Sequence, residues 1–238
     1  MNFGIIAAGE GSRLAQEGIE VPKPLVKIDG KPMIGRLIDI FCDCGATSIS
    51  VIVNEEMKEV RSFLEEKKNE LSCELHLTVK STPSSMHSFY ELASRLAPLG
   101  RYIVTTVDTI FRKIDFEGYV KAFEESSQQT DGMMVVTPFI DDEKPLYVKT
   151  APGGEITAFL DQKEEGVNLV SGGIYGLSEK SLPVLEKALA RGVHRMRNYQ
   201  RALIEAGLDL QAYEIGKVLD VDHAADIQKA EVFLKDES

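Results

Sequence analysis

Short apolar runs rich in β-branched residues alternate with amphipathic stretches through the first half of the chain. The apolar runs predict strands at 2–7, 48–53, 74–79, 102–106 and 132–137. The amphipathic stretches predict helices at 33–44, 57–68, 85–96 and 116–126. Strands that alternate with helices of this length form βαβ crossovers, so we expect a largely parallel sheet with helices on both faces.

The pattern changes after Pro138. Three further apolar runs predict strands at 146–150, 153–159 and 169–177, and no helical period separates the first two. Two helices at 182–190 and 198–206, a strand at 210–215 and a last helix at 224–234 follow. The length of 238 residues and the hydrophobic content of 43% suit one core rather than two. We therefore expect a single Rossmann-like three-layer α/β/α domain, with a mostly parallel central sheet and a small antiparallel excursion in the C-terminal half.

The composition limits which classes of binding partner and which cellular compartment we expect. The net charge of −11 repels nucleic acid and anionic lipid, so an anionic ligand must be held by cations placed locally. The three cysteines, Cys42, Cys44 and Cys73, are odd in number and lack CxxC spacing, which is typical of reduced thiols. The first apolar run is too short for a signal peptide or a membrane span. We expect a soluble, cytoplasmic protein.

A glycine-containing segment, AAGEGSRL, follows the first predicted strand. In open parallel sheets, ligands bind at the carboxyl ends of the strands. Gly9 and Gly11 supply half of the dinucleotide fingerprint G-x-G-x-x-G, but Leu14 stands where its third glycine belongs. Leu14 also stands where a Walker A loop needs its second glycine. The segment therefore belongs to neither motif, which argues against NAD-dependent oxidoreduction.

What remains is a predicted loop over 8–24, with Ser12 and Arg13 beside the glycines and Lys23 in the sequence PKPL at the other end. Glycines let backbone N–H groups approach an anion, the Arg13 guanidinium offers a fork of donors, and Lys23 offers a point charge. Two prolines fix the backbone on either side of that lysine. Taken alone, the segment is either a phosphate cradle or a solvated surface loop.

The order AAGEGSRL, then PKPLVKIDGKPMI leading into a helix, resembles the nucleotidyltransferases that join a nucleoside triphosphate to a phosphorylated small molecule, typically a sugar 1-phosphate. The resemblance implies a nucleotide-binding half over about 1–137 and an acceptor-binding half over about 138–238. It implies that Arg13 and Lys23 are catalytic and stabilise the charge that develops on the phosphates. It further implies that the nucleotide is held by the backbone near Ala8, Gly9, Gly11 and Ser12.

The same resemblance implies a Mg²⁺ site. Asp108 follows the strand YIVTT, where the family carries a metal-binding aspartate, although Val107 replaces the usual preceding glycine. Near the C-terminus, GKVLDVDHAADIQKAE resembles the family's terminal segment, so Asp220 or Asp222 would supply the second metal carboxylate. The alternatives are that Asp108 caps a turn and that Asp222 caps the last helix.

Three further segments match the family less closely. In STPSSMHSFYEL, Ser84 and Ser85 would contact the base, unless the segment is an ordinary helix cap. In LVSGGIYGL, Gly172 and Gly173 would bind the acceptor against bare backbone, unless they mark a bulge. Lys163, in FLDQKEEG, matches the lysine of an acceptor-binding E-K-P motif whose other two positions differ here.

One cluster is locally basic and contains no carboxylate: Arg191, His194, Arg195, Arg197 and Arg201. Such a cluster is usually a solvated helix face. The alternative is that Arg195 or Arg197 reaches an acidic group on the acceptor or on a neighbouring subunit of a homo-oligomer.

The resemblance as a whole implies a Mg²⁺-dependent enzyme that moves a nucleotidyl group from an NTP to a sugar 1-phosphate and releases pyrophosphate. Two alternatives stay open. One is a cytidylyltransferase acting on phosphocholine or another phosphorylated alcohol. The other is a catalytically silent module that binds nucleotide or sugar phosphate.

Overall fold

The computed structural model describes residues 1–141 and 144–235, and its centre is a nine-stranded sheet. The N-terminal half contributes four parallel strands in the order β6-β1-β4-β5. Their bounds are β1 (Asn2–Ile6), β4 (Ser48–Val53), β5 (Glu74–Val79) and β6 (Tyr102–Thr106). The central β4 is buried along its whole length, which explains its continuous apolar sequence.

The C-terminal half adds the predicted antiparallel strands, which confirms the expected fold class. The long strand β11 (Leu169–Leu177) runs antiparallel to β6 and carries β8 (Gly132–Thr137) on its other edge. Beyond β8 lies β12 (Leu210–Glu214), and the hairpin of β9 (Tyr147–Thr150) and β10 (Ile156–Leu160) pairs with the start of β11. The register of β11 against β8 shifts between Ser171 and Tyr175, so the Gly172–Gly173 pair marks a bulge.

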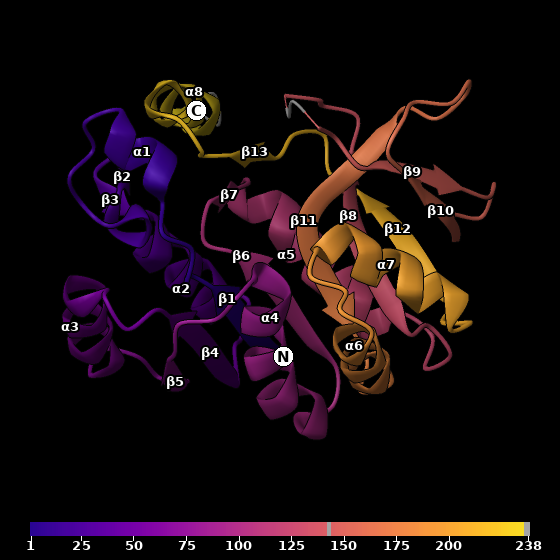
Figure 1. The fold of residues 1–238 in the computed structure, drawn as a ribbon, viewed down its shortest axis with the longest axis horizontal. Helices are drawn as coiled ribbons and strands as arrows, with labels where there is room; N and C mark the ends of the chain where they lie inside the picture. Colours follow the sequence, from indigo (N-terminus) through magenta and orange to yellow (C-terminus); the bar gives the residue numbers. More distant parts are fainter. Residues whose placement is uncertain (142–143, 236–238) are drawn as a thin grey trace.

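Helices cover both faces of the sheet, each burying its apolar stripe in one of two core clusters. One cluster holds α2 (Met33–Asp43), α3 (Lys58–Lys68), α5 (Lys113–Glu125) and part of α8 (Ala224–Lys235). The other holds α4 (Ser85–Leu96), α6 (Ser181–Ala190) and α7 (Met196–Glu205). A short 3-10 turn, η2 (Ala97–Leu99), follows α4. Figure 1 shows that the chain returns at its end, so that yellow α8 lies beside the indigo N-terminal segment.

The expectation of a continuous loop over 8–24 is wrong. A short helix, α1 (Ser12–Gln16), begins after Gly11, and a 3-10 turn, η1 (Lys23–Leu25), contains Lys23. Leu14 is 2% exposed and anchors α1 to the core. A helix of five residues is too short to show a helical period in the sequence, which is why the pattern missed it.

Two short strand pairings, each of two residues per strand, fix further loops. A tight hairpin joins β2 (Lys27–Ile28) to β3 (Lys31–Pro32) through Asp29 and Gly30, both at positive φ. A ladder of β7 (Thr109–Ile110) with β13 (Leu219–Asp220) ties the C-terminal segment to the end of β6.

Within 1–141 and 144–235, no helix is long and apolar enough to cross a membrane.

Candidate active site

A pocket of about 940 Å³ opens where β1, β4 and β6 end. This is the edge at which an open parallel sheet binds its ligands. All six residues predicted to hold the nucleotide line it: Ala8, Gly9, Gly11, Ser12, Ser84 and Ser85. Arg13, Lys23, Asp108 and Asp222 line it too, so segments far apart in the sequence meet here.

Gly11 lets the glycine segment approach Lys23. Its φ of +64° is one that L side chains rarely adopt, and a Cβ at this position would lie 2.8 Å from the Lys23 Cβ. Gly9 differs, because a Cβ there would meet nothing within 4 Å. Gly11 is therefore required by packing, whereas Gly9 leaves its backbone open toward the pocket.

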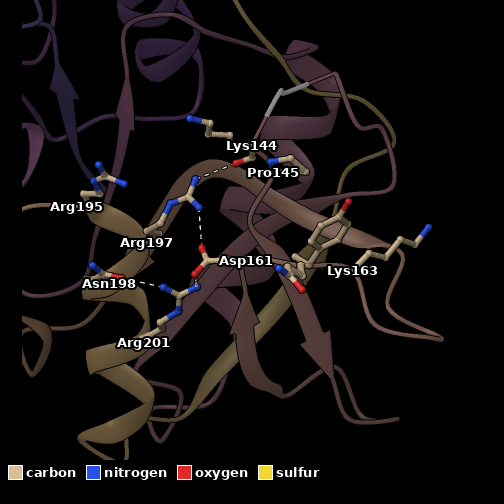
Figure 2. A pocket seen from close by; sticks show the side chains of 10 residues that line it. Lys144, Pro145, Asp161, Lys163, Arg195, Arg197, Asn198 and Arg201 are labelled. Carbon is tan, nitrogen blue, oxygen red and sulfur yellow. Dashed lines mark hydrogen bonds and ion pairs between the residues drawn. The ribbon is translucent and has the colours of Figure 1, made fainter.

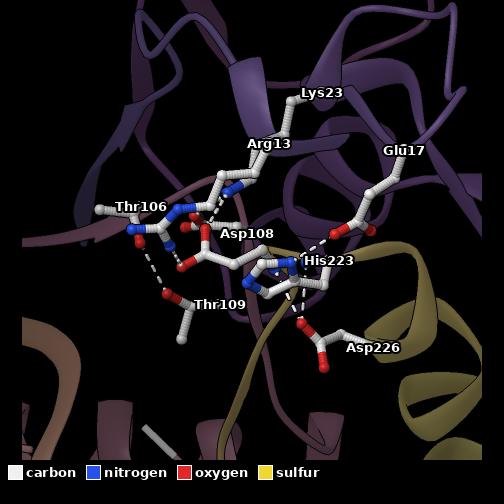
Figure 3. A network of polar contacts seen from close by, with 9 residues as sticks. Arg13, Glu17, Lys23, Thr106, Asp108, Thr109, His223 and Asp226 are labelled. Carbon is white, nitrogen blue, oxygen red and sulfur yellow. Dashed lines mark hydrogen bonds and ion pairs between the residues drawn. The ribbon is translucent and has the colours of Figure 1, made fainter. Parts of the chain in front are cut away.

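Lys23 lies between two carboxylates. Its Nζ donates to Asp108 Oδ2 at 2.5 Å and to Asp222 Oδ1 at 2.8 Å. The other oxygen of Asp222 accepts from the Arg13 guanidinium at 2.8 Å. Figure 3 shows Arg13, Lys23 and Asp108 converging on this point. These four residues, which the sequence analysis identified in separate segments of the chain, thus form one contact network.

The charges in this network stabilise one another. Burial opposes the charged form of Lys23, but Asp108 and Asp222 outweigh it and raise the pKa of the ammonium. Burial likewise opposes ionisation of Asp222, yet Lys23 and Arg13 lower the pKa of that carboxyl. Both groups are therefore charged at neutral pH.

Asp108 and Asp222 fit a Mg²⁺ ion. Their oxygens face a common point, since both lie within 2.8 Å of one ammonium nitrogen. Mg²⁺ is bound by one or two carboxylates together with substrate phosphates, so a pair of aspartates is a suitable protein contribution. Among the described residues, no three His, Cys, Asp or Glu side chains cluster to hold a metal by themselves. A metal here would take its remaining ligands from water or from phosphate oxygens.

Asp220 lies elsewhere. It pairs through its backbone with Thr109 in the β13–β7 ladder, and its side chain lines a neighbouring pocket rather than the nucleotide pocket. The next residue, Val221, donates its N–H to the Asp108 carbonyl at 3.1 Å, which brings the following Asp222 to Lys23. Strand β13 ends at Asp220, so Asp222 lies beyond the ladder, and this break separates two aspartates that would share a face in a continuous strand.

A second set of contacts holds the Asp222 segment, and sequence reasoning missed it. Glu17, at the end of α1, accepts from the Ala224 N–H and pairs with His223 Nδ1, both at 2.6 Å. Asp226 accepts from the backbone N–H groups of Asp222 and His223, at 3.2 and 2.9 Å. Glu17 therefore caps α8, whereas the alternative had given that role to Asp222. No local sequence motif indicates a contact between two residues that are 207 positions apart.

Ser84 has a structural role as well as a place in the pocket. It is the N-cap of α4 and accepts from the His87 N–H at 3.4 Å. Its hydroxyl also lies 2.8 Å from His87 Nδ1.

Asn54 is a pocket residue that the sequence analysis did not predict. It lines the same pocket and donates from Nδ2 to the Ala8 carbonyl at 3.2 Å, which supports the glycine segment.

A second pocket of about 510 Å³ adjoins the first, because Arg13 and Asp222 line both. Gly172, one of the two glycines predicted to bind the acceptor, lines it, and a Cβ there would come within 2.9 Å of Val135. Lys163 is not among its lining residues. Gly173 faces Thr109, and its φ of +72° serves the bulge in β11.

Comparison with known proteins shows the family of the chain. The family model described as nucleotidyl transferase matches residues 4–237. A mannose-1-phosphate guanyltransferase from Gibberella zeae is 29% identical over 187 residues, which is 76% of this chain and 50% of the relative. A UTP–glucose-1-phosphate uridylyltransferase from Haloferax volcanii is 26% identical over 98% of this chain and 96% of the relative.

The fold is also shared with a solved structure. A chain from Bacillus anthracis in complex with sucrose, assigned as a glucose-1-phosphate thymidylyltransferase, superposes with a TM-score of 0.83. The identity is 21%, and the match covers 99% of this chain and 96% of the other. This chain spans about half the length of the Gibberella relative and nearly all of the Haloferax and Bacillus ones.

Proposed function

The chain belongs to the nucleotidyl transferase family, and from that premise we propose that it transfers a nucleotidyl group from an NTP to the phosphate of a sugar 1-phosphate. Pyrophosphate leaves and an NDP-sugar forms. The observation that carries the proposal is the network of Arg13, Lys23, Asp108 and Asp222 on the wall between two adjoining pockets. One pocket takes the NTP, the other takes the acceptor, and the reacting phosphates meet at the network.

The reaction needs no protein nucleophile. An oxygen of the acceptor phosphate, already an anion, attacks the α-phosphorus of the NTP. The bond from the α-phosphorus to the oxygen shared with the β-phosphate breaks as the new bond forms. The barrier comes from repulsion between anions and from charge on the leaving pyrophosphate, so catalysis consists of positioning and electrostatic stabilisation.

Each residue of the network has a role in this scheme. The Lys23 ammonium stabilises the charge on the α-phosphoryl oxygens, and the Arg13 guanidinium binds the phosphate chain with its fork of donors. The exposed backbone at Gly9 gives N–H donors close access to that chain. Asp108 and Asp222 would hold Mg²⁺, which when bound neutralises phosphate charge and orients the two substrates.

The test is a pyrophosphate-release assay of the four common NTPs against a panel of phosphorylated sugars and alcohols. We expect release with at least one sugar 1-phosphate, and loss of release when EDTA removes divalent metal. The Asp108→Asn variant is expected to lose about 100-fold or more in turnover, the effect of removing one preorganised electrostatic contact. No release from any pair would leave a silent binding module as the better description.

A phosphorylated alcohol is the second candidate for the acceptor. It is favoured by one observation: Lys163, the match to the sugar-phosphate motif, does not line the pocket that adjoins the nucleotide site. Phosphocholine and a polyol phosphate therefore belong in the same panel, each offered with CTP. Release with these acceptors and none with the sugar 1-phosphates would select the alternative.

A further inference from the structure

A third pocket, of about 640 Å³, lies where β10 faces the start of α7. It carries five cations and one carboxylate: Lys144, Lys163, Arg195, Arg197, Arg201 and Asp161. The whole protein carries a net charge of −11, so this positively charged pocket is opposite in sign to the protein as a whole. Local excess of one sign in a concave site raises the concentration of ligands of the opposite sign.

Asp161 orients two of these cations. It accepts from Arg197 through Oδ1 at 2.8 Å and pairs with Arg201 through Oδ2 at 2.9 Å (Figure 2). Arg197 also donates to the Lys144 carbonyl at 2.9 Å. The two arginines lower the pKa of Asp161, so the carboxylate is ionised. One carboxylate cannot neutralise two guanidinium groups, and a net positive charge remains at a fixed position.

The backbone adds to this charge. Arg195 is the N-cap of the ten-residue helix α7, and its side chain makes no capping hydrogen bond. The first N–H groups of a helix and its dipole favour an anion at this end. Because Arg195, Arg197 and Asn198 all line the pocket, the start of α7 opens into it. Figure 2 shows Arg197 and Arg201 reaching Asp161 from α7, with Arg195 directed elsewhere.

The cationic pocket continues into the pocket that would take the acceptor. Lys144, Pro145 and Arg197 line both. The acceptor pocket thus shares Arg13 and Asp222 with the nucleotide pocket at one end and Arg197 with the cationic pocket at the other. Its lining also includes other charged or titratable residues: Asp141, Asp220, His223, Asp226 and Lys229. A phosphate that attacks the NTP must lie at the first end. A sugar 1-phosphate whose sugar is neutral has no second anionic group to pair with the cations at the other end.

We propose that the acceptor carries a second anionic group, a carboxylate or a phosphate, and that Arg197 binds it at the mouth of the cationic pocket. The proposal rests on the proposed function, because it takes the acceptor's reacting phosphate as bound beside Asp222. It deepens that function by naming a class of substrate, a phosphorylated small molecule with a second acid group. Of the two arginines that the sequence left as alternatives, it selects Arg197, which is oriented by Asp161 and borders both pockets.

Three probes that share one sugar and one reacting phosphate test the proposal. They are glucose 1-phosphate, glucuronic acid 1-phosphate and glucose 1,6-bisphosphate, which differ in having a hydroxymethyl, a carboxylate or a phosphate at C6. The rate of pyrophosphate release is measured with each probe and with the NTP that the panel selects. We expect kcat/KM to be about tenfold or more higher for the acid probes, through a lower KM, as one charge-assisted contact provides. The better of the two distinguishes carboxylate from phosphate recognition.

Variants separate binding of the second acid from a structural role. Arg197→Gln is expected to abolish the preference, and Arg197→Lys to keep part of it. Arg195→Gln, on an exposed side chain that does not contact Asp161, is expected to change the preference far less than Arg197→Gln. Arg191→Gln is the matched control, since Arg191 belongs to the same basic cluster but does not line the pocket.

Equal kcat/KM for the three probes in the wild-type protein overturns the proposal. An Arg197→Gln variant that loses activity equally on all three also overturns it, because Arg197 would then serve the shared phosphate. If none of the three probes is turned over, the wider panel alone decides the proposed function, and calorimetric binding of the same probes decides the second site. Tighter binding of the acid probes that is lost in Arg197→Gln supports the site, and equal or absent binding overturns it.

Discussion

Replacing Lys23 by methionine removes the ammonium between Asp108 and Asp222 and keeps an aliphatic side chain of similar length. The Lys23 side chain is 11% exposed, and those of Asp108 and Asp222 are 20% and 43% exposed. Exposed ion pairs contribute about 0–1 kcal/mol, and breaking a buried pair costs about 3–5 kcal/mol. This partly buried network lies between these limits, so we expect a loss of about 2 kcal/mol in the free energy of unfolding. In a domain of this size the melting temperature then falls by about 4–8 °C.

Mg²⁺ is expected to offset this loss. In the wild-type protein a divalent cation has to displace the Lys23 ammonium from the two carboxylates. In Lys23→Met the two carboxylates lose the ammonium between them and only Arg13 still pairs with Asp222, so their affinity for Mg²⁺ rises and ligand binding stabilises the fold. Thermal unfolding followed by circular dichroism, with and without MgCl₂, measures both effects. The exposed Lys27, replaced by methionine, provides the control.

The same variant tests catalysis separately from stability. We expect turnover to fall by about 100-fold or more even with Mg²⁺ present, since the metal does not replace the ammonium at the α-phosphate. A variant that melts within about 1 °C of the wild-type protein, with the same Mg²⁺ response, would refute the reasoning. In that case the ammonium does not neutralise the carboxylates.

Three further predictions follow from other contacts. Asp222→Asn is expected to lower turnover by about 100-fold and Asp220→Asn far less, because Asp222 contacts Lys23 and Arg13 whereas Asp220 lines the neighbouring pocket; equal losses in pyrophosphate release contradict this. The Ala224 N–H and then His223 lower the pKa of Glu17, and Glu17 raises the pKa of His223. The stabilisation from the ion pair is complete between the ordinary values of 4.5 and 6.5 and is lost as the pH rises through the raised value of the histidine. The melting temperatures of wild type and Glu17→Ala should therefore differ most in that window and less at higher pH, where only the bond from the Ala224 N–H remains; a difference that does not change with pH contradicts the pairing. Burial raises the pKa of Cys44 to about 11, so iodoacetamide at pH 8 should modify it slowly in the folded protein, as mass mapping checks; rapid modification refutes this.

The sequence pattern predicted the helices and strands that are long enough to repeat their hydrophobic periodicity. It did not predict those that are too short to do so. Strand β4 and helix α4 lie where their patterns put them, because each buries a whole apolar face. Helix α1 was missed, because one buried leucine in five residues carries no period. The β13–β7 ladder was missed as well, since two residues on each side leave no alternation to read.

The candidate site divides in the same way. Arg13, Lys23 and Asp108 were found through local motifs, and the fold brings them together. The choice between Asp220 and Asp222 depends on where strand β13 ends: Asp220 is its last residue and Asp222 lies beyond it, which spacing alone left open. The contact of Glu17 with the start of α8 joins two segments 207 residues apart and has no local signature.

The central claim is that an oxygen of the acceptor phosphate attacks the α-phosphorus at the cation network. The most direct test uses the active pair from the panel, with oxygen-18 in the phosphate of the acceptor, and determines the mass of both products. We predict that the nucleotide product keeps all of the label and that the pyrophosphate carries none. Label in the pyrophosphate, or a nucleoside monophosphate formed by water in place of a labelled product, would contradict the claim.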